Sequence, residues 1–472
     1  MMPTPVTSER LSWRDPAGFV IRAQGRILRA VDPGQFQQTR TLIDSTWTKG
    51  LIEAGSLPRT VELSDPPQVM DHPEQWHWLE HEELSFPCYP HEITALQLYD
   101  SAQLTLRIAI EAANNGWVLK DASAWNVLHS QGRPVFVDLL SFDPMDATGT
   151  WIAYGQFVRH FILPLLLYRE LGMTPPDVFL AHRDGISPSH AHRLLGRRRF
   201  FSRIGMVHVV LPNLLAPAGS RLIAAQSTHK ARTFGAEVGR ELVTRTLGRL
   251  ERAVERLRPN RSTAPSVWRT YEEDRLHYSE ADLVAKKQFV GQHLGDSAAV
   301  LDLGCNAGEY SRLAVEAGKT VVAADGDHGA LSRLYVALRQ TPMPIMPVLV
   351  NIGRPTPAVG WQNKEVASFL DRAAGHFDCI LMLGLIHHLL VSERASLPMI
   401  TDLLHRLNPK HVILEWVEPA DQKFQQLAGL NHALYRHMDT PWLERHMERK
   451  FRLTAKLPLP CNTRVMYLWV RI

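Results

Sequence analysis

The chain has 472 residues, of which 45% are hydrophobic and 21% are charged, and its formal net charge at pH 7 is +4. This length and composition predict two or three domains with their own cores, and they exclude a disordered or collagen-like chain. The four cysteines are far apart without CxxC spacing, which argues against a disulfide framework or a zinc site.

The N-terminal sequence MMPTPVTSERLSWRDP lacks the apolar core of a signal peptide. The most apolar stretch, FILPLLLY at 161–168, is too short to span a bilayer, and Arg159 and Arg169 flank it. We therefore expect a soluble, cytoplasmic protein with no membrane span.

Polar residues with a distinctive spacing occur in LKDASAWNVLHSQGRPVFVDLLSF, residues 119–142. Asp121 precedes Asn126 by five positions, and Asp138 follows a strand-like VFV; the preceding segment 96–117 is expected to be a helix. The segment resembles the catalytic loop and metal-binding aspartate of the protein-kinase-like fold. The resemblance implies an Asp that acts as base, and an Asn and a second Asp that hold magnesium.

The chain departs from that kinase pattern in three ways. The sequence shows no glycine-rich nucleotide loop and no V-A-I-K lysine, and VDLLSF replaces D-F-G. We therefore predict that residues 1–262 form a degenerate α+β kinase-like domain, without phosphotransfer, that recognises the acceptor or a partner. The alternative is a hairpin in which Asp121 and Asn126 serve turns.

Basic residues concentrate between Arg183 and Arg261, where 16 Lys and Arg stand against 5 Asp and Glu, a net +11, so the rest of the chain carries −7. Part of this segment predicts an amphipathic helix with a solvated charged face. Its apolar positions are Leu242, Leu247, Leu250, Val254 and Leu257. The RRR cluster at 197–199 is better placed to meet an anionic partner. The segment PNRSTAPS at 259–266 is the expected linker.

Beyond the linker, strand and helix patterns alternate. Continuous apolar runs predict buried strands at 298–303, 320–325, 345–351, 377–383 and 411–417. Such strands favour a parallel, doubly wound α/β sheet that is covered on both faces. The final RVMYLWVRI at 464–472 has no helix after it and is expected to pair antiparallel in the same sheet. We predict one Rossmann-like domain over 265–472.

The first of these strands ends in VLDLGCNAGEYS, residues 300–311, where an acid precedes two glycines. A dinucleotide fingerprint needs a glycine at the position of Asn306, so that the backbone can approach a pyrophosphate. Here Asp302 precedes Gly304 instead, and the second strand ends in Asp325. Two acids without a phosphate cradle suit a nucleoside that bears a positive charge.

These motifs resemble those of class I S-adenosylmethionine-dependent methyltransferases: D-x-G-C-N-x-G at 302–308, VVAADGD at 321–327, and FDCILMLGLIHHL at 377–389. The whole-chain layout is also similar to rhizobial nodulation methyltransferase-like proteins. The resemblance implies S-adenosyl-L-methionine as cofactor. It further implies that Gly304 and Gly308 let the donor's amino-acid moiety approach the backbone of this turn, which includes Asn306, with Asp302 nearby. Asp325 would bind ribose, and Asn351 would lie near the adenine.

Candidate bases follow the fourth and fifth strands. His387 and His388 lie where acceptors usually bind in this family, and the ordinary histidine pKa suits base catalysis near neutrality. We favour His387, although either histidine could instead cap or pack the next helix. Glu415, late in the fifth strand, is the second candidate, with a buried hydrogen-bonding role as its alternative. Tyr278, in the expected helical segment 270–290, would close over the methionine end of the cofactor or pack in the core.

The leading prediction is methyl transfer to a small-molecule or glycan acceptor, on oxygen. The alternatives are a bifunctional methyltransferase-kinase and a nucleic-acid methyltransferase that uses residues 183–261. The fourth strand is followed by GLIHH rather than (D/N)-P-P-(Y/F), and no aromatic platform for bases stands out, which makes nucleic acid a poor candidate. The sequence leaves the acceptor atom and the oligomeric state open.

Overall fold

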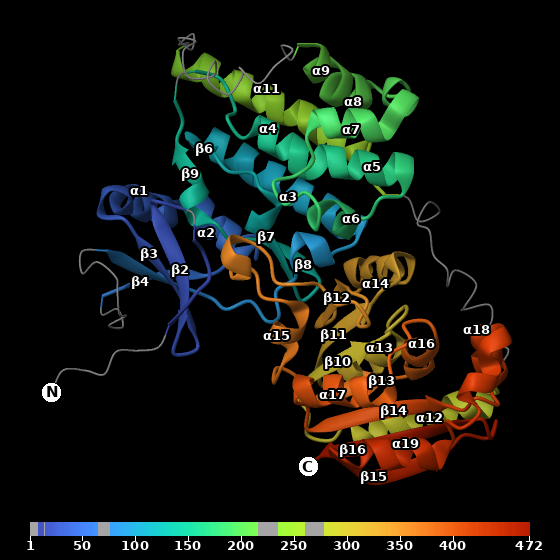
Figure 1. The fold of residues 1–472 in the computed structure, drawn as a ribbon. Coiled ribbons are helices and arrows are strands. Elements are labelled where there is room, and N and C mark those ends of the chain that lie inside the picture. The colour runs from blue at the N-terminus through green and yellow to red at the C-terminus, as the bar shows by residue number, and fades with distance from the viewer. Residues whose placement is uncertain (1–7, 14, 65–75, 147, 216–234, 260–277) are drawn as a thin grey trace. The chain divides into compact units, whose positions relative to one another are not determined.

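The computed structural model describes residues 8–13, 15–64, 76–146, 148–215, 235–259 and 278–472 (Figure 1). Its contacts divide the chain into two compact units. The N-terminal unit comprises Met1–Thr263 with Val359–Val366, and the C-terminal unit comprises Ala264–Ala358 with Ala367–Ile472. The predicted linker from 260 onward, residues 270–277 of the expected helix, and 216–234 of the basic segment lie outside the described residues. The domain limits 1–262 and 265–472 stay a prediction.

The N-terminal unit contains an antiparallel five-stranded sheet in the order β1-β2-β3-β5-β4. Its strands are β1 (Ser8–Arg10), β2 (Gly18–Ala23), β3 (Arg26–Val31), β4 (Thr60–Leu63) and β5 (His77–His81). Apolar side chains such as Phe19, Ile21, Leu28 and Trp78 form a core cluster on this sheet. Two further pairs, β6 (Trp117–Leu119) with β9 (Phe142–Pro144) and β7 (Val127–Ser130) with β8 (Arg133–Phe136), form separate small sheets.

The helices of this unit include two long ones. Among the described residues they are α1 (Pro33–Asp44), α2 (Thr46–Glu53), α3 (Ala95–Asn114), α4 (Tyr154–Phe157), α5 (Leu163–Leu171), α6 (Pro175–Phe179), α7 (Pro188–Leu195), α8 (Arg203–Gly205), α9 (Leu211–Leu215) and α11 (Ala236–Glu255), with π-helical turns at Val158–Ile162 and Met206–Val210. Shorter 3-10 turns lie at Pro90–Glu92, Ala124–Asn126, Leu139–Ser141 and Gly196–Phe200.

Helix α3 confirms the predicted helix before the Asp121 loop. It begins with a capping box, in which Thr94 accepts from the Gln97 backbone and the Gln97 side chain accepts from the Thr94 backbone at 2.8 Å. Helix α11 confirms the predicted amphipathic helix, because Leu247, Leu250 and Val254 are buried while its basic residues face outward. A kinase-like identity for this unit stays a prediction.

The C-terminal unit is built on a seven-stranded sheet in the order β12-β11-β10-β13-β14-β16-β15 (Figure 1). Its strands are β10 (Ala299–Leu303), β11 (Thr320–Asp325), β12 (Ile345–Leu349), β13 (Cys379–Met382), β14 (His411–Val417), β15 (Phe451–Pro458) and β16 (Arg464–Arg471). The first five are parallel, and β16 pairs antiparallel with β14. The predicted Rossmann-like sheet with an antiparallel final strand is therefore confirmed.

Continuous burial explains why the parallel strands have continuous apolar sequences. One face of the sheet packs on α12 (Glu280–His293), α13 (Glu309–Glu316) and α14 (His328–Gln340) through a shared core cluster that includes Val300 and Leu381. Residues on the opposite face, such as Leu301 and Ile380, are also fully buried. Both faces are covered, as a parallel sheet requires. The edge strand β12 tolerates Pro347 because a proline in an edge strand can turn its missing donor side away from a partner.

Helices alternate with the strands of this unit. They are α12 (Glu280–His293), α13 (Glu309–Glu316), α14 (His328–Gln340), α15 (Phe369–Ala373), α16 (Ile386–Val391), α17 (Leu397–Leu407), α18 (Gln422–Ala428) and α19 (Thr440–Met447), with 3-10 turns at Trp361–Asn363, within the segment assigned to the N-terminal unit, and Gly429–Tyr435. The strand order reverses between β10 and β13, which makes their carboxyl ends the topological switch point where open α/β sheets bind ligands.

Candidate functional site

The turn after β10 adopts backbone conformations that glycine and asparagine tolerate best. Gly304, Asn306 and Gly308 have φ angles of 72°, 49° and 78°, which lie in the left-handed region. A side chain on Gly304 would lie 3.3 Å from Leu385, and one on Gly308 would lie 2.6 Å from Leu334 of α14. Gly308 thus permits close packing of α13 on α14, a different role from the predicted approach to the methyl donor.

Asp302 lies at the end of β10 and is 2% exposed. Its Oδ2 accepts a hydrogen bond from Ser311 Oγ at 2.6 Å. Burial raises the pKa of Asp302 to about 6; the Ser311 bond opposes this shift, Asp325 adds to it and Lys286 also opposes it. A cationic ligand in contact with this carboxyl group would therefore stabilise its ionised form.

Asp325 ends the neighbouring strand β11. Its Oδ2 accepts from the Asn306 backbone at 2.8 Å, and its Oδ1 accepts from the Asp327 backbone at 2.8 Å. Burial raises its pKa, although these backbone bonds act in the opposite direction. Because each carboxylate oxygen has a second lone pair, both can still accept from ligand hydroxyls. The backbone bonds fix the carboxylate for that purpose.

A cavity of about 420 Å³ opens at the carboxyl ends of β10, β11, β12 and β13. Six of the seven residues predicted to bind the methyl donor line it, namely Tyr278, Asp302, Gly304, Asn306, Asp325 and Asn351. The exception is Gly308. The side-chain Oδ1 of Asn306 is buried and has no hydrogen-bond partner within the described part of the chain. The structure therefore gathers the sequence motifs around one concave site at the switch point.

Asn351 follows β12 at the side of this cavity. Its Nδ2 donates to Glu393 Oε1 at 2.9 Å, and its Oδ1 accepts from the Gly353 backbone at 2.8 Å. Glu393 also lines the cavity and pairs with Arg354 at 3.0 Å. The Asn351 amide is thus fixed by local contacts, and Glu393 is an acceptor at this end of the cavity that the sequence did not single out.

The two histidines of α16 differ in position. His388 lines the cavity, whereas His387 is 4% exposed, is not part of the lining, and stacks on Phe424 with 6.3 Å between ring centroids. Burial lowers the pKa of His388 to about 4, with Arg464 acting in the same direction. His388 is therefore neutral at neutral pH and can accept a proton. The preference for His387 over His388 is not supported by this geometry.

Glu415 of β14 lies within a fully buried ion-pair network rather than in the cavity lining. Its Oε2 accepts from Lys286 Nζ at 2.6 Å, and its Oε1 accepts from Tyr278 at 2.6 Å and from Arg464 at 3.3 Å. Burial alone would raise the pKa of Glu415, but Lys286 and Arg464 lower it to about 2. A carboxylate held by two cations is a weak base, so this geometry favours the buried hydrogen-bonding alternative.

Sequence reasoning missed the cations of this network. Lys286 lies on α12 and lines the cavity; Arg464 begins β16 and pairs with Asp421 at 2.9 Å as well as with Glu415. Lys286 is 5% exposed and Arg464 is 1% exposed. Only a weak indication in the sequence pointed to a buried Lys286, namely the apolar residues Phe289 and Val290 a few positions further along the same helix.

The kinase-like residues of the N-terminal unit meet an unpredicted arginine. Arg29 of β3, 6% exposed, donates from Nη1 to Asp138 Oδ1 at 2.8 Å and from Nη2 to the Val137 carbonyl at 3.2 Å. Ser141 donates to the other oxygen of Asp138, and Asn126 donates to Ser141 Oγ at 3.3 Å. A cationic side chain therefore neutralises the carboxylate that magnesium would use.

Asp121 lies close enough to Asp138 to be affected by its charge. Burial raises the pKa of Asp121, and Asp138 acts in the same direction. Its Oδ1 accepts from the Ser123 backbone at 3.0 Å, a turn contact of the kind that the hairpin alternative expects. Within the described residues, no group of three or more His, Cys, Asp and Glu side chains could hold a metal ion.

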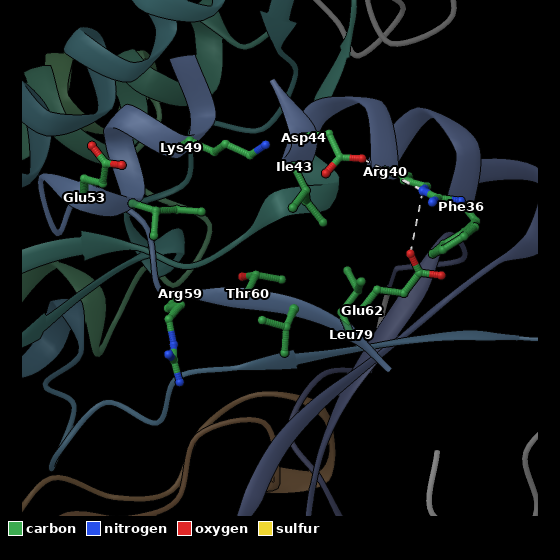
Figure 2. Close-up of a pocket in the computed structure, with 12 residues that line it drawn as sticks. Phe36, Arg40, Ile43, Asp44, Lys49, Glu53, Arg59, Thr60, Glu62 and Leu79 are labelled. Carbon is green, nitrogen blue, oxygen red and sulfur yellow. Dashed lines mark ion pairs between the residues drawn. The ribbon is translucent and has the colours of Figure 1, made fainter. Parts of the chain in front are cut away.

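A second cavity of about 410 Å³ lies within the N-terminal unit, between α1, α2 and β4 (Figure 2). Phe36 and Leu79 contribute apolar surface, and charged residues of both signs surround it. Figure 2 shows Arg40 between Asp44 and Glu62, with ion-pair distances of 3.9 and 3.7 Å. This balance of charge indicates no particular reaction.

The RRR cluster is partly used within the protein. Arg198 donates to the Glu170 carbonyl, Arg199 donates to the Gly196 carbonyl, and the Arg199 guanidinium lies 4.5 Å from the Phe200 ring centroid. Two of the three arginines therefore have local roles.

Among the described residues, none of the helices combines the length and the apolar character that a membrane span requires.

Comparison with known proteins places this geometry in context. Residues 275–452 match the family model described as a methyltransferase domain. The chain is 26% identical over 470 residues to the nodulation protein NoeA of Rhizobium meliloti (strain 1021), a match that covers 98% of this chain and 95% of the relative.

Two solved structures are each similar to less than half of the chain. The N-methyltransferase NodS from Bradyrhizobium japonicum WM9 is 12% identical with a TM-score of 0.30, over 42% of this chain and 98% of its own. The bifunctional kinase-methyltransferase WbdD is 20% identical with a TM-score of 0.29, over 44% of this chain and 43% of its own.

The match over 275–452 spans the parallel strands and the lined cavity. The near-full-length relative confirms the similarity to rhizobial nodulation proteins that the layout predicted. Residues 275–452 are a methyltransferase domain, and the protein is an S-adenosylmethionine-dependent methyltransferase.

Proposed function

We propose that the protein transfers a methyl group to a hydroxyl of a small-molecule or glycan acceptor, and that the N-terminal unit aids recognition of the acceptor or of a partner. The observation that carries the proposal is the cavity at the switch point, where Asp302 and Asp325 lie at the ends of adjacent strands to receive the methyl donor and His388 lines the same cavity as a candidate base for a hydroxyl acceptor. The name of the near-full-length relative further supports a role linked to nodulation.

The residues of the cavity fit the donor. Asp325, held by two backbone donors, would accept hydrogen bonds from the ribose hydroxyls, and Asp302 would face the ammonium of the amino-acid end. Asn351 would lie beside the adenine. The buried Oδ1 of Asn306 is a further acceptor that a bound ligand could satisfy. The acid-rich lining also suits the positive charge of a sulfonium.

When bound, S-adenosylmethionine supplies an activated methyl group on a positively charged sulfur. The protein's main contribution is to position the acceptor oxygen in line with that methyl group. A neutral alcohol is a poor nucleophile, so its proton must leave as the new bond forms, and His388 is the cavity-lining group best suited to accept it. Its pKa of about 4 keeps the imidazole neutral and able to accept a proton at pH 7, but it also makes His388 a weaker base than an ordinary histidine, so alignment with the acceptor has to supply more of the rate.

The observations favour neither alternative function. Arg29 pairs with Asp138 at 2.8 Å and so neutralises the carboxylate that a metal ion would use in phosphotransfer. The local contacts of Arg198 and Arg199 leave less of the basic cluster for nucleic acid.

The decisive experiment is a screen of acceptors with radiolabelled methyl donor over oligosaccharides, RNA and protein, with Asp325→Ala as the control for donor binding. The proposal expects label on an oligosaccharide or small hydroxyl compound, and loss of labelling in the variant. Transfer to RNA or protein alone would refute the proposed acceptor class while leaving the methyltransferase activity intact.

A further inference from the structure

Among the described residues that line the methyltransferase cavity, one is a lysine and one is an arginine. Lys286 of α12 is 5% exposed, whereas Arg312 of α13 is half-buried and donates from Nη1 to the Ala307 carbonyl at 2.9 Å. A buried charge is costly unless it is paired, so Lys286 requires either a structural or a ligand-binding explanation.

The protein holds the Lys286 ammonium in a fixed place. Its Nζ donates to Glu415 Oε2 at 2.6 Å and lies 5.2 Å and 4.9 Å from the ring centroids of Tyr278 and Tyr310, which also line the cavity. Aromatic faces attract a cation. Because an ammonium has three donors, it can bind a second carboxylate while it keeps its bond to Glu415.

An opposite charge lines the same cavity. Asp302, at the end of β10, is 2% exposed and hydrogen-bonded to Ser311 at 2.6 Å. Asp302 and Lys286 interact electrostatically. An anion and a cation in one cavity suit a ligand with an ammonium and a carboxylate on the same carbon, such as the amino-acid end of the methyl donor.

We propose that Lys286 binds the α-carboxylate of the methyl donor while Asp302 faces its α-ammonium, and that Glu415 and Arg464 are positioning residues that hold Lys286. This assignment rests on the proposed function, because it specifies how the same cavity recognises the donor's amino-acid end. Arg464 pairs with Glu415 at 3.3 Å and with Asp421 at 2.9 Å, so the positioning contacts extend from α12 to β16.

The test compares two ligands that share adenine and ribose. S-adenosylhomocysteine carries the amino-acid end, and 5′-deoxy-5′-methylthioadenosine lacks it. Calorimetry on the full chain should show that Lys286→Gln weakens binding of the first by about 10- to 100-fold, as loss of a charge-assisted bond predicts, and weakens the second by less than about threefold. Lys286→Arg, which retains the charge, should recover most of the lost affinity.

Two controls separate ligand binding from folding. The double variant Lys286→Gln with Glu415→Gln removes both charges of the buried pair, so no carboxylate is left without its lysine. It should lose affinity for S-adenosylhomocysteine selectively, as Lys286→Gln alone does. Arg312→Gln should leave both affinities within about threefold of wild type, since its guanidinium serves the Ala307 carbonyl.

The assignment would be overturned if Lys286→Gln, alone and together with Glu415→Gln, lost affinity equally for S-adenosylhomocysteine and for 5′-deoxy-5′-methylthioadenosine. It would also be overturned if Arg312→Gln, and not Lys286→Gln, lost affinity for S-adenosylhomocysteine selectively. If the wild-type protein bound neither ligand, the proposed function itself would fail. Wild-type binding therefore tests the proposed function, and the variants test only the role of Lys286.

Discussion

Replacement of Glu415 by glutamine tests whether the buried ion-pair network stabilises the methyltransferase unit. Glu415 is fully buried and contacts Lys286 and Arg464, and its pKa of about 2 lies well below the ordinary 4.5. That difference corresponds to about 3 kcal/mol of stability for the ionised group at pH 7. Removal of one partner from a buried pair typically costs a similar amount, about 3–5 kcal/mol.

The sign of the pH dependence follows from the lowered pKa. A carboxyl group whose folded-state pKa is depressed contributes its full stability above about pH 4.5 and loses it as the pH falls toward 2. The advantage of wild type over Glu415→Gln should therefore be complete above pH 5 and should shrink by about 2 kcal/mol by pH 3.

Hydrogen exchange of amides in β14 and β16 measures the free energy of opening this unit at each pH. Asp402→Asn provides a matched control, because Asp402 pairs with Lys450 at 2.5 Å but is 66% exposed, so its loss should change stability by less than about 1 kcal/mol. If Glu415→Gln matched the stability of wild type at pH 7, or if its deficit stayed constant down to pH 3, the electrostatic reasoning would be refuted.

Three further predictions concern activity and the N-terminal unit. Asp325→Ala should weaken S-adenosylmethionine binding at least tenfold by calorimetry, since charge-assisted bonds to ribose contribute about 1.5–3 kcal/mol each, and no affinity for NAD should appear in either protein. For a hydroxyl acceptor, His388→Ala should lower the turnover rate by about 10²–10⁴-fold with donor affinity unchanged, whereas His387→Ala should leave the turnover rate near that of wild type. The wild-type rate should not change with pH above pH 5, because His388 is already neutral there. If the two substitutions lowered the turnover rate equally, the geometry would be contradicted. Arg29→Leu should lower the thermal stability of the N-terminal unit, and wild-type protein should not hydrolyse ATP. Magnesium-dependent hydrolysis that Asp138→Ala abolishes would establish the bifunctional alternative.

The sequence predicts the parallel strands well for a physical reason. A strand covered on both faces needs apolar residues at every position, so β10, β11 and β13 stand out as short continuous runs. Strand β15 escaped notice because it lies at the sheet edge, where one face is solvated and apolar and exposed residues alternate along Phe451–Pro458. The alternation of apolar and polar residues along this segment is nevertheless a pattern that predicts a half-buried strand.

Some residues of the candidate site can be predicted from the strand they follow, whereas the position of others depends on contacts with distant parts of the chain. Asp302, Gly304 and Asp325 follow strands directly, so their place at the carboxyl edge of the sheet comes with the strand prediction. Adjacent positions on a helix point in different directions, and the choice between His387 and His388 depends on how α16 packs, which their sequence alone does not reveal.

Contacts between distant residues set the charges of both units. Lys286 and Glu415 are 129 positions apart, and Arg29 and Asp138 are 109 apart. No periodic pattern links such pairs, because each member is an unremarkable charged residue in its own segment.

The same energetics explain why the methyltransferase network is better understood as a device for placing a charge than as a stabilising feature. Well-packed hydrophobic residues can replace a buried ion pair at little or no cost in stability, because they avoid the desolvation of both charges. An apolar pair could therefore replace Lys286 and Glu415 together at little cost in stability, although removal or neutralisation of only one of them is costly. A cation fixed at the cavity wall, 2.6 Å from its counter-ion and near the rings of Tyr278 and Tyr310, gains a use only when a carboxylate-bearing ligand enters. Stability alone would favour an apolar pair at these positions, whereas recognition of the donor's amino-acid end requires the charged one.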